Sequence, residues 1–137
     1  MVSCKILVVE DDRDDALLLR RALEGAARRR AVALAVEHSA NGFEGIATVG
    51  RSDLIDALPD AVVVDLNMPI MDGMAFLRSL RGALQLDHLH AAVLTTSTER
   101  AIHEAASCAG ADSVFVKPDT FVEFLTIAEE ILTAAGV

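Results

Sequence analysis

The chain has 137 residues, and its 21 acidic and 12 basic side chains leave a formal net charge of −9. Apolar residues make up 53% of the chain and aromatic residues only 4%. This length predicts one domain with a core of its own, and the apolar content excludes a disordered chain. The acid excess argues against nucleic-acid binding, because such binding depends on Lys and Arg neutralising phosphates.

No apolar stretch approaches the roughly 20 residues that a membrane span requires, and the N-terminus does not have the pattern of a secretory signal. We therefore expect a cytoplasmic protein without a membrane partner. The two cysteines, Cys4 and Cys108, lack the close Cys or His companions of a zinc site. Each lies in an apolar or alanine-rich segment, so we expect both to be small buried residues.

Short β-branched runs and amphipathic stretches alternate along the chain, which is typical of buried strands followed by helices. The predicted elements, in chain order, are a strand at 6–9, a helix at 14–27, a weaker strand at 31–38, a helix from 43, a strand at 61–64, a helix at 74–81, a strand at 91–94, a helix at 99–109, a strand at 114–116 and a helix at 120–134. This alternation predicts an α/β fold, a doubly wound parallel sheet with helices on both faces.

Polar residues follow the predicted strands at Glu10, Asp11, Asp65, Thr95 and Lys117. In such sheets ligands bind at the carboxyl ends of the strands, so we expect these side chains to converge there. Carboxylates held close together repel one another, and a hard divalent cation such as Mg²⁺ relieves that repulsion. An ammonium and a hydroxyl beside a carboxylate suit a phosphoryl group, and an Asp can itself accept one as an aspartyl-phosphate.

Four segments together resemble the receiver domain of the two-component response regulators: Ile6–Asp12, Val62–Gly73, Val93–Ser97 and Ala109–Pro118. They stand in the order that the family has and span nearly the whole chain. The resemblance implies a flavodoxin-like fold, whose five-stranded parallel sheet has the order 2-1-3-4-5. It also implies that residues 1–137 form one receiver domain of a signalling protein that has no turnover substrate.

By the same resemblance, Asp65 is the phosphoacceptor, and the donor is a phosphohistidine on a sensor histidine kinase or a histidine phosphotransfer protein. Thr95 matches the hydroxyl residue that bonds the phosphoryl group and moves when it arrives. Lys117 matches the lysine that pairs with a phosphoryl oxygen. Pro118 follows the lysine, and in the family this Lys–Pro peptide bond is usually cis, which would help to aim the lysine.

The resemblance also implies a set of ligands for Mg²⁺. Asp11 would bind the ion directly, Glu10 would bind it through water, and Asp65 belongs to the same set. Asn67 matches the position whose backbone carbonyl completes the protein's share of the ligands.

Other polar residues near these positions have simpler interpretations. The acids Asp12, Asp14 and Asp15 are typical of a helix start, and Asp72-Gly73 is typical of a turn and cap. Thr96 and Ser97 are interpreted as the start of the next helix. Gly110 is suited to end a helix, and Thr120 with Glu123 forms a capping box. The four histidines, at positions 38, 88, 90 and 103, are interpreted as incidental.

One position departs from the family pattern. The residue three before the lysine is usually Tyr or Phe, whose ring swings inward on activation, and here it is Val114. Phe115 is adjacent, but strand alternation predicts that it points to the opposite face. Activation would then be read out without the usual aromatic switch, whereas the phosphorylation chemistry would be unaffected.

Several alternatives stay open. The chain could be a degenerate, phosphate-independent interaction module, or a receiver from a larger regulator with a DNA-binding output. A phosphohydrolase with an Asp nucleophile is disfavoured, since Asn67 stands where such an enzyme needs a second acid. The start of the first helix is similar to that of receivers that partner phytochrome-type kinases. A homodimer through the face of residues 99–134 is a further expectation, with Ile102, Val114 and Phe115 as candidate contacts.

Overall fold

Five strands and five helices alternate along residues 1–137 of the computed structural model, all of which the structure describes. The strands are β1 (Ser3–Val9), β2 (Ala33–Ser39), β3 (Ala61–Asp65), β4 (His90–Thr95) and β5 (Ser113–Val116). The helices are α1 (Arg13–Arg29), α2 (Gly42–Leu54), α3 (Gly73–Arg81), α4 (Arg100–Ala109) and α5 (Phe121–Ala134). The strands form one parallel sheet in the order β2-β1-β3-β4-β5, so the predicted fold class and strand order are confirmed.

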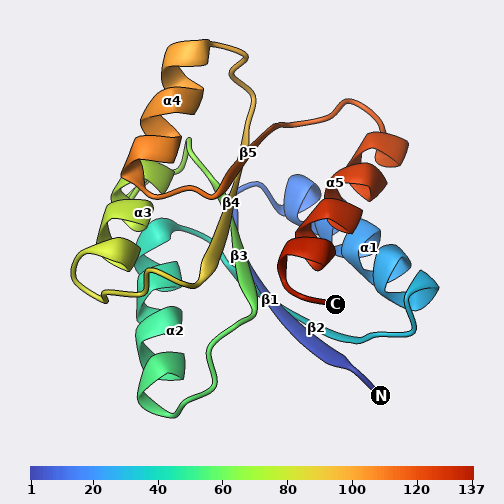
Figure 1. Ribbon diagram of the computed structural model, residues 1–137. Helices are drawn as coiled ribbons and strands as arrows, with labels where there is room; N and C mark the ends of the chain where they lie inside the picture. Colours follow the sequence, from blue (N-terminus) through green and yellow to red (C-terminus); the bar gives the residue numbers. More distant parts are fainter.

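The sheet has a separate hydrophobic core on each face. Helices α1 and α5 cover one face, and α2, α3 and α4 cover the other (Figure 1). Alternate residues of β1 point to opposite faces, so Ile6 packs in the core with α1 and α5 whereas Leu7 packs in the core with α3. Because both faces are covered, β1, β3 and β4 each contain a continuous apolar run, which is why their sequences are the clearest strand signals.

Strand β2 lies at an edge of the sheet and is less buried, which explains its weaker sequence signal. Its residues alternate between exposed and partly buried positions along most of its length. Because an edge strand has a neighbour on one side only, its sequence need not be a continuous apolar run. The predicted strand 31–38 therefore has the right position, and its bounds are shifted by one or two residues.

The predicted caps are largely confirmed. Asp12 is the N-cap of α1, and its side chain accepts hydrogen bonds from the backbone N–H groups of Asp14 and Asp15. Thr120 caps α5 by accepting from the N–H of Glu123, and Gly110 ends α4 with φ of 124°. The Asn41-Gly42 pair is the N-cap and first residue of α2.

The predicted burial is wrong for one of the two cysteines. Cys4 is buried in β1, whereas Cys108 on α4 is exposed. The alanine-rich sequence around Cys108 is typical of a helix, but α4 buries only Ala106 fully. An amphipathic helix covers a sheet with one stripe of residues, and Cys108 lies outside that stripe.

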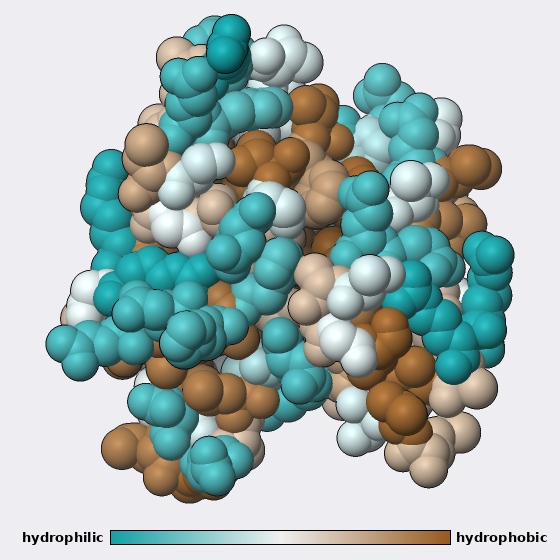
Figure 2. All heavy atoms as spheres, viewed as in Figure 1, coloured by the Kyte–Doolittle hydropathy of each residue, from teal (hydrophilic) through white to brown (hydrophobic).

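Apolar side chains also reach the surface at the C-terminal end of α2. Leu54 and Ile55 are 88% and 74% exposed there, where Figure 2 shows hydrophobic atoms at the lower end of the molecule. None of the five helices combines the length with the apolar content that crossing a bilayer demands.

Candidate functional site

The carboxyl ends of the central strands meet at one edge of the sheet. Asp65 is the last residue of β3 and Thr95 the last of β4, while Glu10 directly follows β1 and Lys117 directly follows β5. The parallel register brings these ends together, since Val9 pairs with Val64 and Asp65 pairs with Leu94. The predicted convergence of polar residues at this edge is therefore confirmed.

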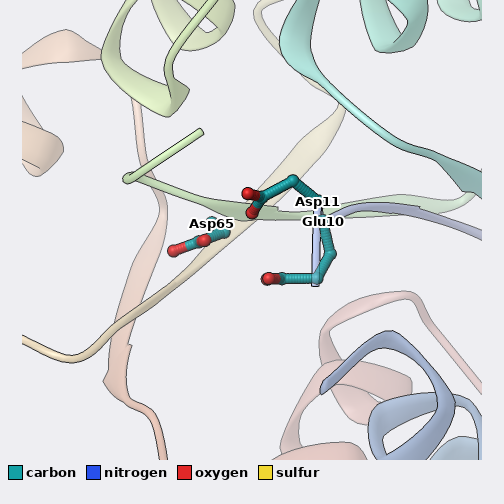
Figure 3. Close-up of side chains that lie close together, drawn as sticks. All are labelled: Glu10, Asp11 and Asp65. Carbon is teal, nitrogen blue, oxygen red and sulfur yellow. The ribbon is translucent and has the colours of Figure 1, made fainter. Parts of the chain in front are cut away.

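Three carboxyl groups form an acidic cluster, defined as Glu10, Asp11 and Asp65. Each offers an oxygen that lies within 4.8 Å of the other two, and the side chains of Glu10 and Asp11 extend toward Asp65 (Figure 3). Glu10 and Asp65 are 4% and 5% exposed, whereas Asp11 faces solvent. The cluster thus has a buried floor and an open side from which a ligand can enter.

Burial changes the acidity of the two buried members of the cluster. Desolvation raises the pKa of Glu10 to about 7, with repulsion from Asp65 adding to the rise and Lys117 opposing it. Desolvation also raises the pKa of Asp65, and the nearby Lys117 and the N–H of Asn67 only partly offset this rise. The N–H of Asn67 donates to Oδ1 of Asp65 at 3.3 Å. Both carboxylates therefore gain from a positive charge beside them.

The donor set of the cluster fits Mg²⁺. It consists of carboxylate oxygens only, without His or Cys, and hard oxygen ligands favour Mg²⁺ over Zn²⁺. Two of the three carboxylates are buried next to each other, so a divalent cation would relieve a repulsion that a single lysine does not cancel.

Lys117 contacts three carboxylates. Its Nζ donates to Oδ2 of Asp15 at 2.9 Å and to Oε1 of Glu10 at 3.1 Å, and it lies 3.4 Å from Oδ2 of Asp65. Its side chain is only 12% exposed. Burial alone would lower its pKa, but the carboxylates of Asp15, Glu10 and Asp65 together raise it. Lys117 is therefore an ammonium held at the floor of the site.

Two expectations about this part of the site need correction. The chain contains no cis peptide bond, so the Lys117–Pro118 bond is trans, the form that X–Pro bonds ordinarily favour. Lys117 is held in place without a cis bond. Its ammonium forms ion pairs, and its backbone N–H donates to the Thr95 carbonyl. Asp15 does more than stabilise the start of α1, because its carboxylate makes the shortest contact with the Lys117 ammonium.

The signal that could have indicated this role of Asp15 is its position in the helix. It lies in the first turn of α1, and helical side chains lean toward the N-terminus of their helix. The side chain of Asp15 therefore points toward the end of β1, where the site lies.

Thr95 is fully buried, and its hydroxyl binds the loop that follows β4. Its Oγ1 accepts a hydrogen bond from the Ser97 N–H at 3.1 Å, and the Ser97 carbonyl lies 2.7 Å from Nε2 of His103 on α4. Ser97 also accepts from the N–H of Glu99, the N-cap residue of α4, which fits its predicted place at a helix start. His103, interpreted from the sequence as incidental, thus links α4 to the loop beside Thr95.

His38 also departs from the incidental role expected for the histidines, because its Nε2 lies 2.7 Å from the backbone oxygen of Glu10. The predicted opposite orientation of Val114 and Phe115 is confirmed: Val114 packs toward the core of α3, and Phe115 toward the core of α1 and α5. No aromatic ring therefore occupies the position of the usual switch residue.

The fold and the acidic cluster at the strand ends define a receiver domain. Residues 6–129 match the family model of the response regulator receiver domain, so the chain belongs to this family of two-component signalling proteins. Receiver domains are signalling modules that partner histidine kinases or phosphotransfer proteins and bind Mg²⁺ at an acidic pocket.

Among curated relatives, the transcriptional regulatory protein PrrA of Mycobacterium tuberculosis is 30% identical over 99% of this chain and 53% of its own length. The response regulator MprA of the same species is 35% identical over 96% of this chain and 51% of its own length. The chain thus spans about half the length of these relatives. Among solved structures, the phosphorylated cyanobacterial phytochrome response regulator RcpA has a TM-score of 0.80 and 25% identity, covering 95% of this chain and 91% of that one.

Proposed function

We propose that Asp65 accepts a phosphoryl group from a phosphohistidine of a histidine kinase or a histidine phosphotransfer protein. An oxygen of the Asp65 carboxylate would attack phosphorus, the P–N bond would break, and the electron pair would leave with the imidazole, which then takes a proton. The observation that carries this proposal is the Lys117 ammonium, 3.4 Å from Oδ2 of Asp65. It would stabilise the charge that develops on a transferring phosphoryl group.

The other residues of the site would hold and read that group. The Thr95 hydroxyl would donate its hydrogen to a phosphoryl oxygen, because its oxygen accepts from the Ser97 N–H and its own O–H stays available as a donor. Glu10, Asp11, Asp65 and the Asn67 carbonyl would hold Mg²⁺, which supplies positive charge against the carboxylates and the phosphoryl oxygens. Because Val114 replaces the usual aromatic residue, the Ser97–His103 contact offers another link from the site to α4.

The first test uses the protein with Mg²⁺ and acetyl phosphate, a small phosphodonor. Intact-mass measurement should show one added phosphoryl group on the parent, none on Asp65→Asn, and one on Asp53→Asn, an exposed control on α2. Equal labelling of Asp65→Asn and the parent would show that the acceptor lies elsewhere. A parent that is never labelled, by acetyl phosphate or by any kinase, would favour the phosphate-independent interaction module.

A phytochrome-type kinase is our proposal for the cognate donor. It is supported by the similarity to the phosphorylated phytochrome response regulator RcpA and by the sequence at the start of α1. Phosphotransfer profiling tests it: among purified histidine kinases, one of the phytochrome type should label the parent fastest, and preference for another class would contradict the proposal.

We also propose that residues 1–137 act as one cytoplasmic receiver domain that signals by protein contacts and turns over no other substrate. A homodimer through α4, β5 and α5 is part of this proposal. Val116, Phe121 and Val122 are exposed there and support it, whereas the expected contacts Ile102, Val114 and Phe115 pack against the two cores. Light scattering before and after phosphorylation tests the dimer, and a monomer in both states would rule it out.

A further inference from the structure

Resting on the proposed function, we propose that Asp15 is a positioning residue that aims one N–H of Lys117 at the phosphoryl group on Asp65. Asp15 lies in the first turn of α1, outside the acidic cluster that fits Mg²⁺. It contributes no oxygen to that cluster, and its side chain binds the Lys117 ammonium, so we assign its effect on Asp65 to the lysine.

The Lys117 ammonium has few donors for the carboxylates around it. A lysine ammonium has three N–H groups. Two of them are used in hydrogen bonds at 2.9 Å to Asp15 and 3.1 Å to Glu10. The carboxylate of Asp65 lies at 3.4 Å, which is an ion-pair distance without a hydrogen bond of the same quality. The third N–H is therefore the one that remains for a group on Asp65.

Two fixed partners define where the third N–H points. Lysine has a long, flexible stem, and its ammonium is a point charge without a preferred direction. With Glu10 as its one partner, the flexible side chain could still swing the ammonium about that hydrogen bond. The carboxylate of Asp15, on α1, supplies the second anchor, although Asp15 and Lys117 are 102 residues apart in the sequence. With both anchors in place, the ammonium is preorganised and its charge does not have to reorient when phosphorus arrives.

Glu10 has a second role that Asp15 does not share. Glu10 belongs to the acidic cluster, so substituting it changes the cation site and the lysine together. Asp15 is 34% exposed at its side chain and contributes no oxygen to that cluster. Substituting Asp15 therefore separates the positioning of Lys117 from the binding of Mg²⁺.

The test compares Asp15→Asn with Asp14→Asn, the same change of charge at the neighbouring residue, whose side chain is exposed and does not contact Lys117. At saturating Mg²⁺ we expect Asp15→Asn to lower the maximal rate of phosphorylation by acetyl phosphate roughly tenfold, since small misplacements of a reacting group cost such factors. The Mg²⁺ concentration at half-maximal rate should stay within about twofold of the parent for both variants. Asp15→Glu, which keeps the carboxylate, should recover part of the rate.

A double-mutant cycle shows whether Asp15 acts through the lysine. In a Lys117→Gln background, Asp15→Asn should have no further effect on the rate. A second readout needs no phosphorylation: an amine-reactive ester should modify Lys117 faster in Asp15→Asn than in Asp14→Asn, as followed by peptide mass spectrometry.

Equal rates for Asp15→Asn and Asp14→Asn, or an effect that persists in the Lys117→Gln background, would overturn the inference. If the parent is not phosphorylated but Lys117 still becomes more reactive in Asp15→Asn, the proposed function fails and the anchoring by Asp15 stands. If phosphorylation proceeds and neither readout responds to Asp15, the positioning role fails alone.

Discussion

Gly73 at the start of α3 lies directly against the backbone of Asp65. A Cβ added to Gly73 would collide with the Asp65 carbonyl oxygen and would stand 2.7 Å from the Cα of Leu66. The Gly73 N–H donates to the Leu66 carbonyl at 3.0 Å, which closes the loop between β3 and α3. The turn-and-cap interpretation of Asp72-Gly73 is confirmed for Asp72, the N-cap of α3, while Gly73 is needed for this close approach.

Gly73→Ala should therefore destabilise the fold and displace Asp65. Because the neighbouring atoms are backbone and cannot move aside cheaply, we expect a loss of about 1–3 kcal/mol in the free energy of unfolding. Urea unfolding measures it. Gly50→Ala on α2 is the control, since its Cβ would meet only a leucine methyl at 4.0 Å and Ala favours a helix. Equal stability of Gly73→Ala and the parent would show that this contact is loose.

Mg²⁺ should stabilise the protein against thermal unfolding. A cation that binds only the folded state adds about 2.7 kcal/mol at a concentration 100 times its dissociation constant. Scanning calorimetry with and without MgCl₂ measures the shift, with NaCl at equal ionic strength as the control. Asp11→Asn should remove most of the shift, because it takes away the exposed member of the acidic cluster. A melting temperature that Mg²⁺ leaves unchanged would contradict a built cation site.

The elevated pKa of Glu10 predicts a pH dependence of stability in the metal-free protein. Folded Glu10 keeps its proton up to about pH 7, whereas the unfolded chain releases it near the ordinary value of 4.5. The folded state thus binds more protons between these values, so the contribution of Glu10 to stability falls as the pH rises through this window and is constant above it.

Urea unfolding of the parent and Glu10→Gln between pH 4.5 and 8, with a chelator present, tests this dependence. The stability of Glu10→Gln relative to the parent should increase with pH up to about 7 and then level off. A difference that is flat across the range would show that burial does not perturb this carboxyl group.

The two cysteines should differ sharply in reactivity. Cys108 is exposed, whereas Cys4 is buried and its pKa is raised to about 11 by burial and then by Asp60. Only the thiolate is the nucleophile, so a brief treatment with a maleimide should add one label to the native protein, at Cys108. Unfolding in urea should expose the second thiol, and peptide mapping assigns the site. Native labelling at Cys4 would contradict its burial in β1.

Much of the fold and of the site could be predicted from the sequence because the relevant signals are local. A strand covered on both faces must be a continuous apolar run, so residues such as Val62, Val63 and Val64 mark β3 directly. A residue at the carboxyl end of such a strand, like Asp65, has its place in the site set by the strand itself. The same reasoning places Thr95 and Lys117.

The remaining features of the fold and of the site depend on which distant parts of the chain pack together. The alternation of strands and helices, the parallel sheet and the convergence of polar strand ends follow from local sequence patterns and from parallel pairing. The contact of Asp15 with Lys117, the exposure of Cys108 and the contact of His103 with the Ser97 carbonyl are visible in the folded protein alone. These outcomes depend on the rotation of a helix about its axis against the sheet, and that rotation is set by the packing of many side chains at once.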